Sequence, residues 1–447
     1  MKKKNLRSGY AKQGQRLFLL SFGALIALGT LLLWIPGMYD GPKKLSLMDS
    51  LFTATSAVCV TGLAVKPISD FSFWGQLVIL LLIQAGGLGI MTLSASIMMA
   101  LGRGLSFGES LMVSNLNDKF SLRGTESLTR TVINYTFIAE GIGFVALLPG
   151  MWYSDGIGFW KGLWGALFLS VSSFCNSGMT TFPDSLVGIN RGAQLPAALL
   201  AITGGLGVYV IHDIIQVAQR KQPRLRVHSK LVLCTTAALL LGGTLAIWGF
   251  CYDHETQKNS IDLFDAFCFA VTSRTCGWNT APMDSLSYLA TRFIMLLMLI
   301  GGSPGSTAGG IKTSTVALAL AGIWSTLRGD QDTLVFKRRI PAGNVMRALT
   351  IIILFVLLSS IGALMLVVVE AEIEPVNTSF EAVSALTTTG LSLGGTTGKL
   401  SDAGWGKLML VVFMFLGRVG PFTALLFLMG REKHGQLKYP EERVIIG

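Results

Sequence analysis

The sequence predicts an all-α polytopic membrane protein: eight transmembrane helices in four repeats of span, half-helix, filter loop and span around a pseudo-fourfold pore. Three observations predict this fold. Of the 447 residues, 51% are hydrophobic and only 14% are charged, against roughly 25% charged in an average soluble domain. Eight apolar runs reach the roughly 20 residues that are needed to cross the hydrocarbon layer of a membrane. One short motif recurs four times at matched positions.

The composition excludes several classes of protein. A mean hydropathy of +0.58 argues against a soluble enzyme. The formal net charge of +11 comes from Lys and Arg spread over every predicted inner loop, without interleaved aromatic residues, so no nucleic-acid partner is expected. The six cysteines form no CxxC pair, which argues against a metal cluster or a disulfide scaffold.

The apolar runs predict the spans directly. The first run follows a basic start and is too long for the apolar core of a signal peptide, so we expect a retained anchor helix. The predicted spans lie near residues 17–36, 75–101, 131–152, 194–218, 230–251, 292–324, 347–369 and 405–430.

Each pair of spans encloses a shorter apolar stretch that ends in Gly-rich polar sequence. These stretches are too short to cross a membrane, and they predict re-entrant half-helices, which membranes tolerate where the backbone lines a water-filled path or is buried in protein. They lie at 47–62, 163–178, 262–277 and 375–390. Lys and Arg concentrate in the loops on one side, which predicts cytoplasmic N- and C-termini and half-helices that enter from outside.

A repeat relates the four half-helices. Each ends in a glycine, and a phenylalanine stands ten residues before that glycine. The glycines are Gly62, Gly178, Gly277 and Gly390, and the phenylalanines are Phe52, Phe168, Phe267 and Phe380. A second glycine follows in the next span at Gly87, Gly205, Gly302 and Gly417. The predicted repeats cover residues 1–104, 105–222, 223–330 and 331–447, the last with a C-terminal tail.

Four such loops around one axis would suit a cation. The C-terminal end of each half-helix carries partial negative charge, and the loop after it can direct backbone carbonyls at an ion without its water shell. Glycine allows the strained backbone that this requires. A single glycine could equally be a small-residue helix contact, but four at matched offsets argue against that. The candidate ion-binding residues are Val60, Thr61, Gly62, Asn176, Ser177, Gly178, Thr275, Cys276, Gly277, Thr388, Thr389 and Gly390.

The stretch from Gly301 to Gly310 holds five glycines, a proline, two serines and a threonine inside the sixth span. A continuous helix disfavours this composition, so the stretch predicts an unwound intramembrane loop below the filter. The alternative is a plain loop between two short helices.

Two arginines inside the membrane need a reason, because a charge there is costly. Arg418 would face the pore and raise the barrier to a cation, or hold the unwound loop through its carbonyls, or pair with Glu140. Arg274 would brace the filter from behind. Three cysteines, Cys59, Cys175 and Cys276, are expected beside the ion path.

These motifs carry a resemblance. The four loops, the stretch from Gly301 to Lys312, the Gly417-Arg418-Val419-Gly420-Pro421 segment and Tyr439-Pro440 resemble the Trk/Ktr/HKT superfamily of potassium transporters over essentially the whole chain. The length, the short N-terminus and the span count are more similar to the bacterial KtrB membrane subunit than to the longer TrkH type.

The resemblance implies K⁺ uptake across a bacterial cell (inner) membrane, often with Na⁺ dependence. It also implies a homodimer in the lipid bilayer and a cytosolic RCK-type nucleotide-binding regulatory subunit that is KtrA-like. Glycine at all four filter positions is associated in this family with preference for K⁺ over Na⁺. The implied gate comprises Gly302, Ser303, Pro304, Gly305, Ser306, Thr307, Ala308, Gly309, Gly310, Lys312 and Arg418.

Alternatives remain open. A Na⁺-coupled K⁺ symporter or a TrkH-type subunit would share much of this pattern, although half-helices that all enter from one side favour a pore over inverted repeats. A membrane enzyme would need polar residues converging at mid-depth. With four histidines and Glu140 as the one acid expected at mid-span, the sequence predicts no enzyme.

Overall fold

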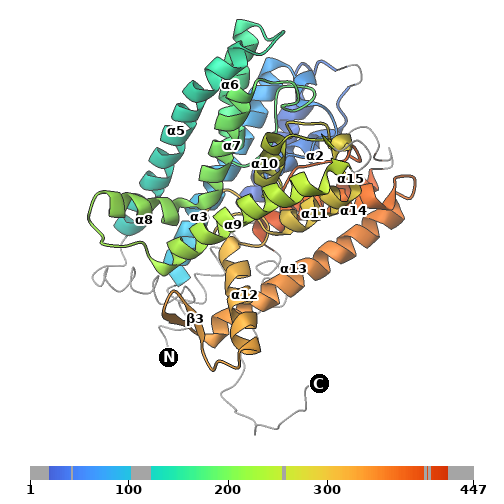
Figure 1. Ribbon diagram of the computed structural model, residues 1–447. Helices are drawn as coiled ribbons and strands as arrows, with labels where there is room; N and C mark the ends of the chain where they lie inside the picture. The colour runs from blue at the N-terminus through green and yellow to red at the C-terminus, as the bar shows by residue number, and fades with distance from the viewer. Residues whose placement is uncertain are drawn as a thin grey trace.

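Helices dominate the protein. The computed structural model describes residues 20–41, 44–101, 122–253, 258–396, 400 and 404–420. Two small antiparallel hairpins accompany the described helices: β1 (Tyr252–Asp253) with β2 (Lys258–Asn259), and β3 (Thr333–Val335) with β4 (Arg338–Ile340). Figure 1 shows β3 at the end of the molecule that also carries the foot of α12.

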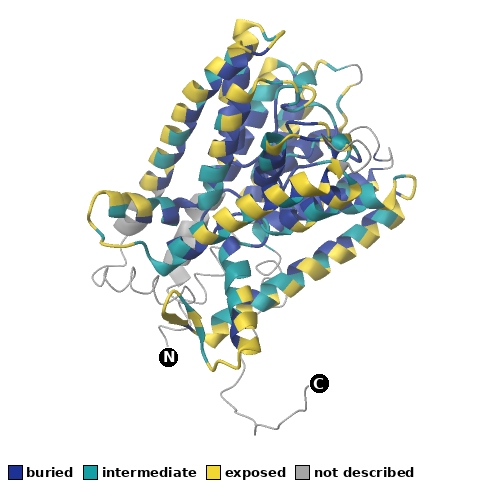
Figure 2. Ribbon diagram, in the orientation of Figure 1, coloured by how far each residue is buried: buried dark blue, intermediate teal, exposed yellow. Residues whose placement is uncertain are grey.

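Four half-helices form the centre of the molecule, and they occupy the predicted stretches. They are α2 (Leu47–Val58), α6 (Phe159–Phe174), α10 (Leu263–Thr272) and α14 (Pro375–Thr387). With 10 to 16 residues each, they are too short to cross a membrane. Three of the four matched phenylalanines are fully buried, and Figure 2 shows dark blue residues gathered around α2, α10 and α14.

The other helices surround this centre. Their outward faces are exposed, as Figure 2 shows for α5, α9 and α13, and these faces carry large apolar side chains, as expected of helices that face lipid. The surrounding helices are Leu20–Trp34, α3 (Phe73–Leu101), α5 (Leu122–Trp152), α7 (Arg191–Leu206), α8 (Val208–Ala218), α9 (Val227–Phe250), α11 (Tyr288–Leu299), α12 (Thr313–Leu327), α13 (Ala342–Val369) and α15 (Trp405–Val419).

The prediction of eight spans is confirmed only in part. Within the described ranges, three helices are long and apolar enough to cross a membrane alone: Thr131–Trp152, Val227–Phe250 and Ala342–Val369. The bent pair α7 and α8 adds a fourth candidate. α3 covers the predicted second span, but its side chains are described only up to Gly89. The ends of the predicted first and eighth spans lie outside the described residues, as does Tyr439-Pro440.

The predicted fourth span is wrong as a single helix. The chain bends by 95° between α7 and α8, so that α8 projects sideways from the foot of α7 in Figure 1. Gly207 makes the bend with a φ of +80°, and a side-chain carbon on this residue would lie 2.7 Å from Ser303 Oγ. Only glycine accepts both the backbone conformation and the close approach.

Three of the half-helices pack closely against the span that follows them. A side-chain carbon on Gly86, Gly204 or Gly417 would lie about 2 Å from the carbonyl oxygen at the end of the preceding half-helix. These oxygens belong to Val58, Phe174 and Leu386. The matched glycines of the second and fourth spans were expected one residue later, at Gly87 and Gly205. Glycine therefore fixes the half-helices in place by allowing direct backbone contact.

Candidate functional site

The four loop glycines meet in a closed ring. A side-chain carbon built on each glycine would lie within 2.4 Å of a carbonyl oxygen in the next loop. The pairs are Gly62 with Ser177 O at 2.1 Å, Gly178 with Cys276 O at 1.8 Å, Gly277 with Thr389 O at 2.4 Å and Gly390 with Thr61 O at 2.2 Å. The fourth loop touches the first, so the four loops surround one axis in sequence order.

The loop backbones share one conformation. Each glycine has a positive φ, and so does the residue two positions before it, whereas the residue between them does not. The non-glycine residues are Val60 (54°), Asn176 (60°), Thr275 (79°) and Thr388 (52°). Such alternation points successive N–H groups to one side of the chain and leaves the carbonyls on the other.

The N–H groups of the loops turn back toward the half-helices. Thr61 N donates to Ser56 O at 2.8 Å, and Thr389 N donates to Ser384 O at 2.9 Å. The carbonyls of the twelve candidate residues accept no hydrogen bond from any residue that the structure describes. Buried carbonyls are normally paired, so a ring of free carbonyls is available to a cation.

Serine side chains support two of the loops. Ser56 Oγ accepts from Gly62 N at 3.1 Å, and Ser384 Oγ accepts from Gly390 N at 3.0 Å. In the second loop Ser172 Oγ donates to Met179 O at 2.7 Å. The third loop has Val271 at this position, so it lacks the serine support.

The three cysteines lie behind the ring. Cys59, Cys175 and Cys276 are at most 1% exposed. The thiol of Cys175 is directed at Gln84 Oε1 (3.8 Å) and Glu140 Oε1 (3.9 Å). Gln84 Nε2 donates to Glu140 Oε2 at 3.2 Å. The buried carboxyl of Glu140 therefore belongs to the support of the second loop, a role that its sequence position did not indicate.

Residues 300–312 form the expected unwound loop between α11 and α12. Its base is closed by hydrogen bonds from Gly301 N to Ile311 O (3.0 Å) and from Thr313 N to Gly302 O (3.0 Å). Most of its residues are buried. We call residues 301–310 the intramembrane loop.

The intramembrane loop is hydrogen-bonded to the bend between α7 and α8. Ser303 N donates to Gly205 O at 2.9 Å, Ser303 Oγ donates to Leu206 O, and Val208 N donates to Gly305 O at 3.2 Å. No sequence pattern indicated this contact, although the run Gly204-Gly205-Leu206-Gly207 could have indicated a broken helix.

Three basic side chains donate to carbonyls of the intramembrane loop. Arg418 Nη1 donates to Thr307 O at 2.5 Å, Lys312 Nζ to Ala308 O at 2.7 Å and Arg274 Nη2 to Gly301 O at 3.2 Å. Among the described residues, none of the three pairs with a carboxylate, so the alternative pairing of Arg418 with Glu140 is not observed. Their positive charge is directed at the loop instead.

The intramembrane loop also contacts the ring. Thr307 Oγ1 donates to Phe174 O at 3.1 Å and lies 3.2 Å from the side-chain amide of Asn176. A side-chain carbon on Gly309 would lie 2.0 Å from Thr388 Oγ1. The loop is therefore packed directly against the second and fourth ring loops.

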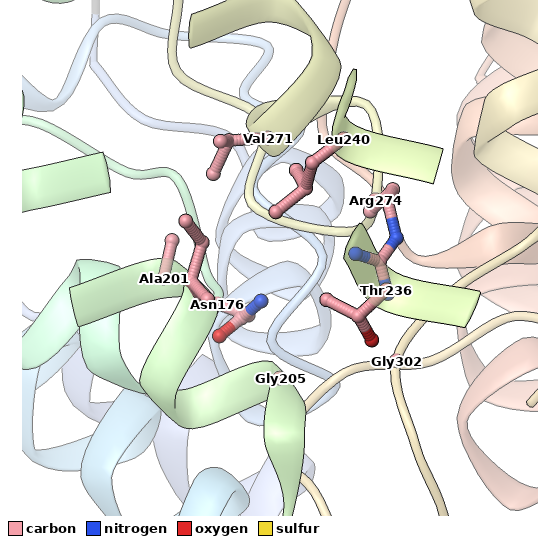
Figure 3. Close-up of a pocket in the computed structure, with 9 residues that line it drawn as sticks. Asn176, Ala201, Gly205, Thr236, Leu240, Val271, Arg274 and Gly302 are labelled. Carbon is pink, nitrogen blue, oxygen red and sulfur yellow. The ribbon is translucent and has the colours of Figure 1, made fainter. Parts of the chain in front are cut away.

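A small cavity lies between the second and third repeats beside the intramembrane loop. Figure 3 shows Arg274, Asn176 and Thr236 around this space. The room for the centre of a water molecule is about 10 Å³, close to the minimum for one water. Nε of Arg274 has no hydrogen-bond partner within the described part of the chain, so this buried donor borders a space that water could enter.

The fold and the ring define a polytopic membrane protein whose re-entrant loops enclose an axis. A family model described as TrkH, cation transport protein, matches residues 7–250 and 254–434. The chain belongs to this family of cation transport proteins, and, as expected, it is not an enzyme.

Full-length relatives support this assignment. The chain is 34% identical to "Ktr system potassium uptake protein B" of Vibrio alginolyticus over 98% of this chain and 96% of the relative. It is 32% identical to the protein of that name from Bacillus subtilis, over 96% and 95%. It is also 32% identical to "Potassium/sodium uptake protein NtpJ" of Enterococcus hirae, over 97% of each.

A solved structure shows the same fold. The crystal structure of the potassium transporter TrkH from Vibrio parahaemolyticus matches with a TM-score of 0.70 at 17% identity, over 93% of this chain and 85% of that one. The family model and the full-length relatives together confirm the resemblance to the Trk/Ktr family.

Proposed function

We propose that the protein takes up K⁺ through the ring of loop carbonyls. The observation that carries the proposal is the closed order of the four loops, each glycine against a carbonyl of the next, with twelve carbonyls that accept no hydrogen bond from the described residues. The C-terminal ends of four half-helices add partial negative charge around the same axis. Close relatives named as potassium uptake proteins support K⁺ as the ion.

The proposal also includes a division of the chain into four repeats. Repeats at 1–104, 105–222, 223–330 and 331–447 would each supply one half-helix and one loop to a pseudo-fourfold filter. The sequence order of loops around the ring supports this division, because each repeat contacts the next and the last contacts the first.

The intramembrane loop is the proposed gate. It is packed against the ring, and Lys312 and Arg418 hold two of its carbonyls. These two cationic side chains, bonded to a loop beside the proposed ion path, would raise the barrier to K⁺ electrostatically. Movement of this loop would therefore open the path, and its return would close it.

The proposed setting is a Ktr-type complex in a bacterial inner membrane. The chain would be its multi-pass membrane subunit, a homodimer with cytoplasmic termini, regulated by a cytosolic RCK-type nucleotide-binding partner similar to KtrA. Two proteins of the Ktr system, which are 34% and 32% identical over nearly the full length, support this assignment over a TrkH-type subunit, since the TrkH of Vibrio parahaemolyticus is 17% identical.

Na⁺ is the proposed second ion. The relative whose name includes potassium and sodium supports Na⁺-dependent uptake. Na⁺ could travel with K⁺, as in a symporter, or activate the transporter without crossing. Parallel tracer measurements of both ions separate these alternatives, because only a symporter moves Na⁺ in fixed proportion to K⁺.

The test is tracer uptake of K⁺ and Na⁺ in a bacterial strain that lacks its own K⁺ uptake, with and without the regulatory partner. We expect expression to restore K⁺ uptake and growth at low K⁺, with faster uptake when Na⁺ is present. A membrane-inserted protein that takes up Na⁺ but no K⁺ under all these conditions would contradict the proposal.

A further inference from the structure

We infer that the intramembrane loop is also the brace of the selectivity filter, through Arg274 and Thr307, so that movement of the loop changes the choice between K⁺ and Na⁺. The inference rests on the proposed function and adds two residues that set its selectivity. It follows from how the ring loops are supported.

The third ring loop is supported differently from the others. The other three half-helices have a serine near their end that bonds the loop or its continuation, whereas the third has Val271. The third loop instead contains Arg274, and this side chain donates to Gly301 O at the base of the intramembrane loop. Within the repeat, Gly277 N donates to the backbone oxygen of Thr272 at 3.2 Å instead of to a serine hydroxyl. Arg274 thus adds to the third loop a side-chain bond that reaches the gate.

Arg274 is well placed for this role. It is 8% exposed, has no carboxylate partner within the described ranges, and lines the cavity beside the gate. A buried guanidinium without a counter-ion is costly, so its hydrogen bond to Gly301 O contributes more than a bond between neutral groups. The third loop and the base of the intramembrane loop therefore hold each other.

Thr307 supports the second ring loop. Its hydroxyl donates to Phe174 O, the last residue of α6, and contacts the Asn176 amide, whose amide nitrogen can also reach Phe174 O and Ala201 O at 3.2 Å. Asn176 is one of the positive-φ residues of the ring. The carbonyl oxygen of Thr307 also accepts a hydrogen bond from Arg418. One gate residue therefore contacts both the filter and the eighth span.

The fourth loop completes this arrangement through the close contact of Gly309 with Thr388 Oγ1. Three of the four ring loops thus rest on the intramembrane loop. When that loop moves aside, these contacts must break, and the carbonyls become free to shift. Since selectivity depends on the placement and field of the carbonyls, an open gate would discriminate less strongly against Na⁺.

The experiment compares K⁺ and Na⁺ flux in proteoliposomes that contain the full chain, as the parent and as Arg274→Gln, Thr307→Val and the double variant. Arg292→Gln on α11 and Thr326→Val on α12 are matched controls remote from the ring. We expect each single variant to lower the K⁺/Na⁺ flux ratio about fivefold or more, as the loss of a hydrogen bond to a charged or buried group would allow.

Two further variants test whether Arg274 and Thr307 support the filter through the loop. Thr307→Ser keeps the hydroxyl and should restore the parental ratio. In the double variant the K⁺/Na⁺ ratio should fall by less than the product of the two single fold-changes, because both residues act through one loop. If Arg274→Gln does not fold, Arg274→Lys, which keeps one donor and the charge, should give an intermediate ratio.

Parental selectivity in folded Arg274→Gln and Thr307→Val proteins would overturn the inference, as would fully multiplicative effects in the double variant. A parent that conducts no K⁺ would instead contradict the proposed function. The two failures are therefore distinguishable in one set of measurements.

Discussion

Arg418 on α15 donates from Nη1 to the carbonyl oxygen of Thr307 at 2.5 Å, and so connects the eighth predicted span to the intramembrane loop. The guanidinium is 7% exposed, and its Nε and Nη2 have no partner within the described residues. Among the described residues, this hydrogen bond is thus the polar contact that holds the guanidinium in place. It joins residues 111 positions apart in the sequence.

Removal of this bond should free the loop. Arg418→Ala is expected to raise K⁺ flux and to weaken its dependence on the regulatory partner, since a hydrogen bond to a charged group contributes about 1.5–3 kcal/mol. Tracer flux at equal protein level is the measurement. Reduced flux in a folded variant would show that Arg418 supports the structure rather than the closed state.

Shortening the segment from Ser303 to Gly309 should act in the same direction. The segment fills the space against the ring, and its loss removes both the obstruction and the carbonyls that attract the basic side chains. We expect faster K⁺ flux that responds less to the regulatory partner. Slower flux with normal amounts of protein would show that the segment is required to hold the ring.

Gly62→Ser should weaken selectivity. A side-chain carbon at this position would lie 2.1 Å from Ser177 O, and the φ of +99° already disfavours any residue but glycine. The carbonyls of the first and second loops must therefore shift. Competition between K⁺ and Na⁺ for uptake is the measurement, and serine at Gly178, Gly277 or Gly390 should act similarly.

Gly141→Ser is the matched control, because Gly141 on α5 has no atom within 4 Å of the added carbon. Selectivity should remain parental in this variant. If folded Gly62→Ser protein also keeps parental selectivity, the filter assignment is wrong.

Low external Ag⁺ should block K⁺ uptake, and excess K⁺ should slow the block. Thiols bind soft cations strongly, and Cys59, Cys175 and Cys276 lie directly behind the ring. Simultaneous replacement of the three by Ser or Ala should remove the block, while the exposed Cys234 remains. Bulky charged thiol reagents should act slowly, since these thiols are at most 1% exposed. Equal block of the triple variant would place the thiols away from the ion path.

Lys407→Met should destabilise the protein. Lys407 Nζ pairs with Asp49 Oδ1 at 2.9 Å, with both side chains nearly buried, and joins α15 to α2. Loss of one partner from a buried pair costs about 3–5 kcal/mol, whereas apolar replacement of both is often tolerated. Thermal unfolding in detergent should therefore show a larger loss for Lys407→Met than for Asp49→Leu with Lys407→Met.

The pair Arg191–Asp262 provides the control, because both side chains are more than half exposed. Exposed pairs contribute about 0–1 kcal/mol, so Arg191→Gln should unfold close to the parental temperature. A Lys407→Met protein as stable as Arg191→Gln would show that the buried pair makes no net contribution.

Local chemistry explains what the sequence by itself determined. Membrane-length apolar runs, short half-helices and the break in the sixth span follow from hydropathy and from the helix propensity of glycine, which are properties of consecutive residues. The loop glycines could be found for the same reason, since their positive φ is a local requirement that only glycine meets without strain. Hence the four loops and the unwound segment were predictable by residue number.

Tertiary structure alone decided how these parts meet. The sequence order of loops around the ring depends on contacts between Cα atoms and carbonyl oxygens. The supports of the intramembrane loop likewise end on backbone oxygens, as at Thr307, Ala308 and Gly301. Every residue has such an oxygen, so no side-chain pattern marks the acceptor. The local glycine run could have indicated the 95° bend at Gly207, but the close approach of Ser303 to this bend is a contact between segments distant in the chain.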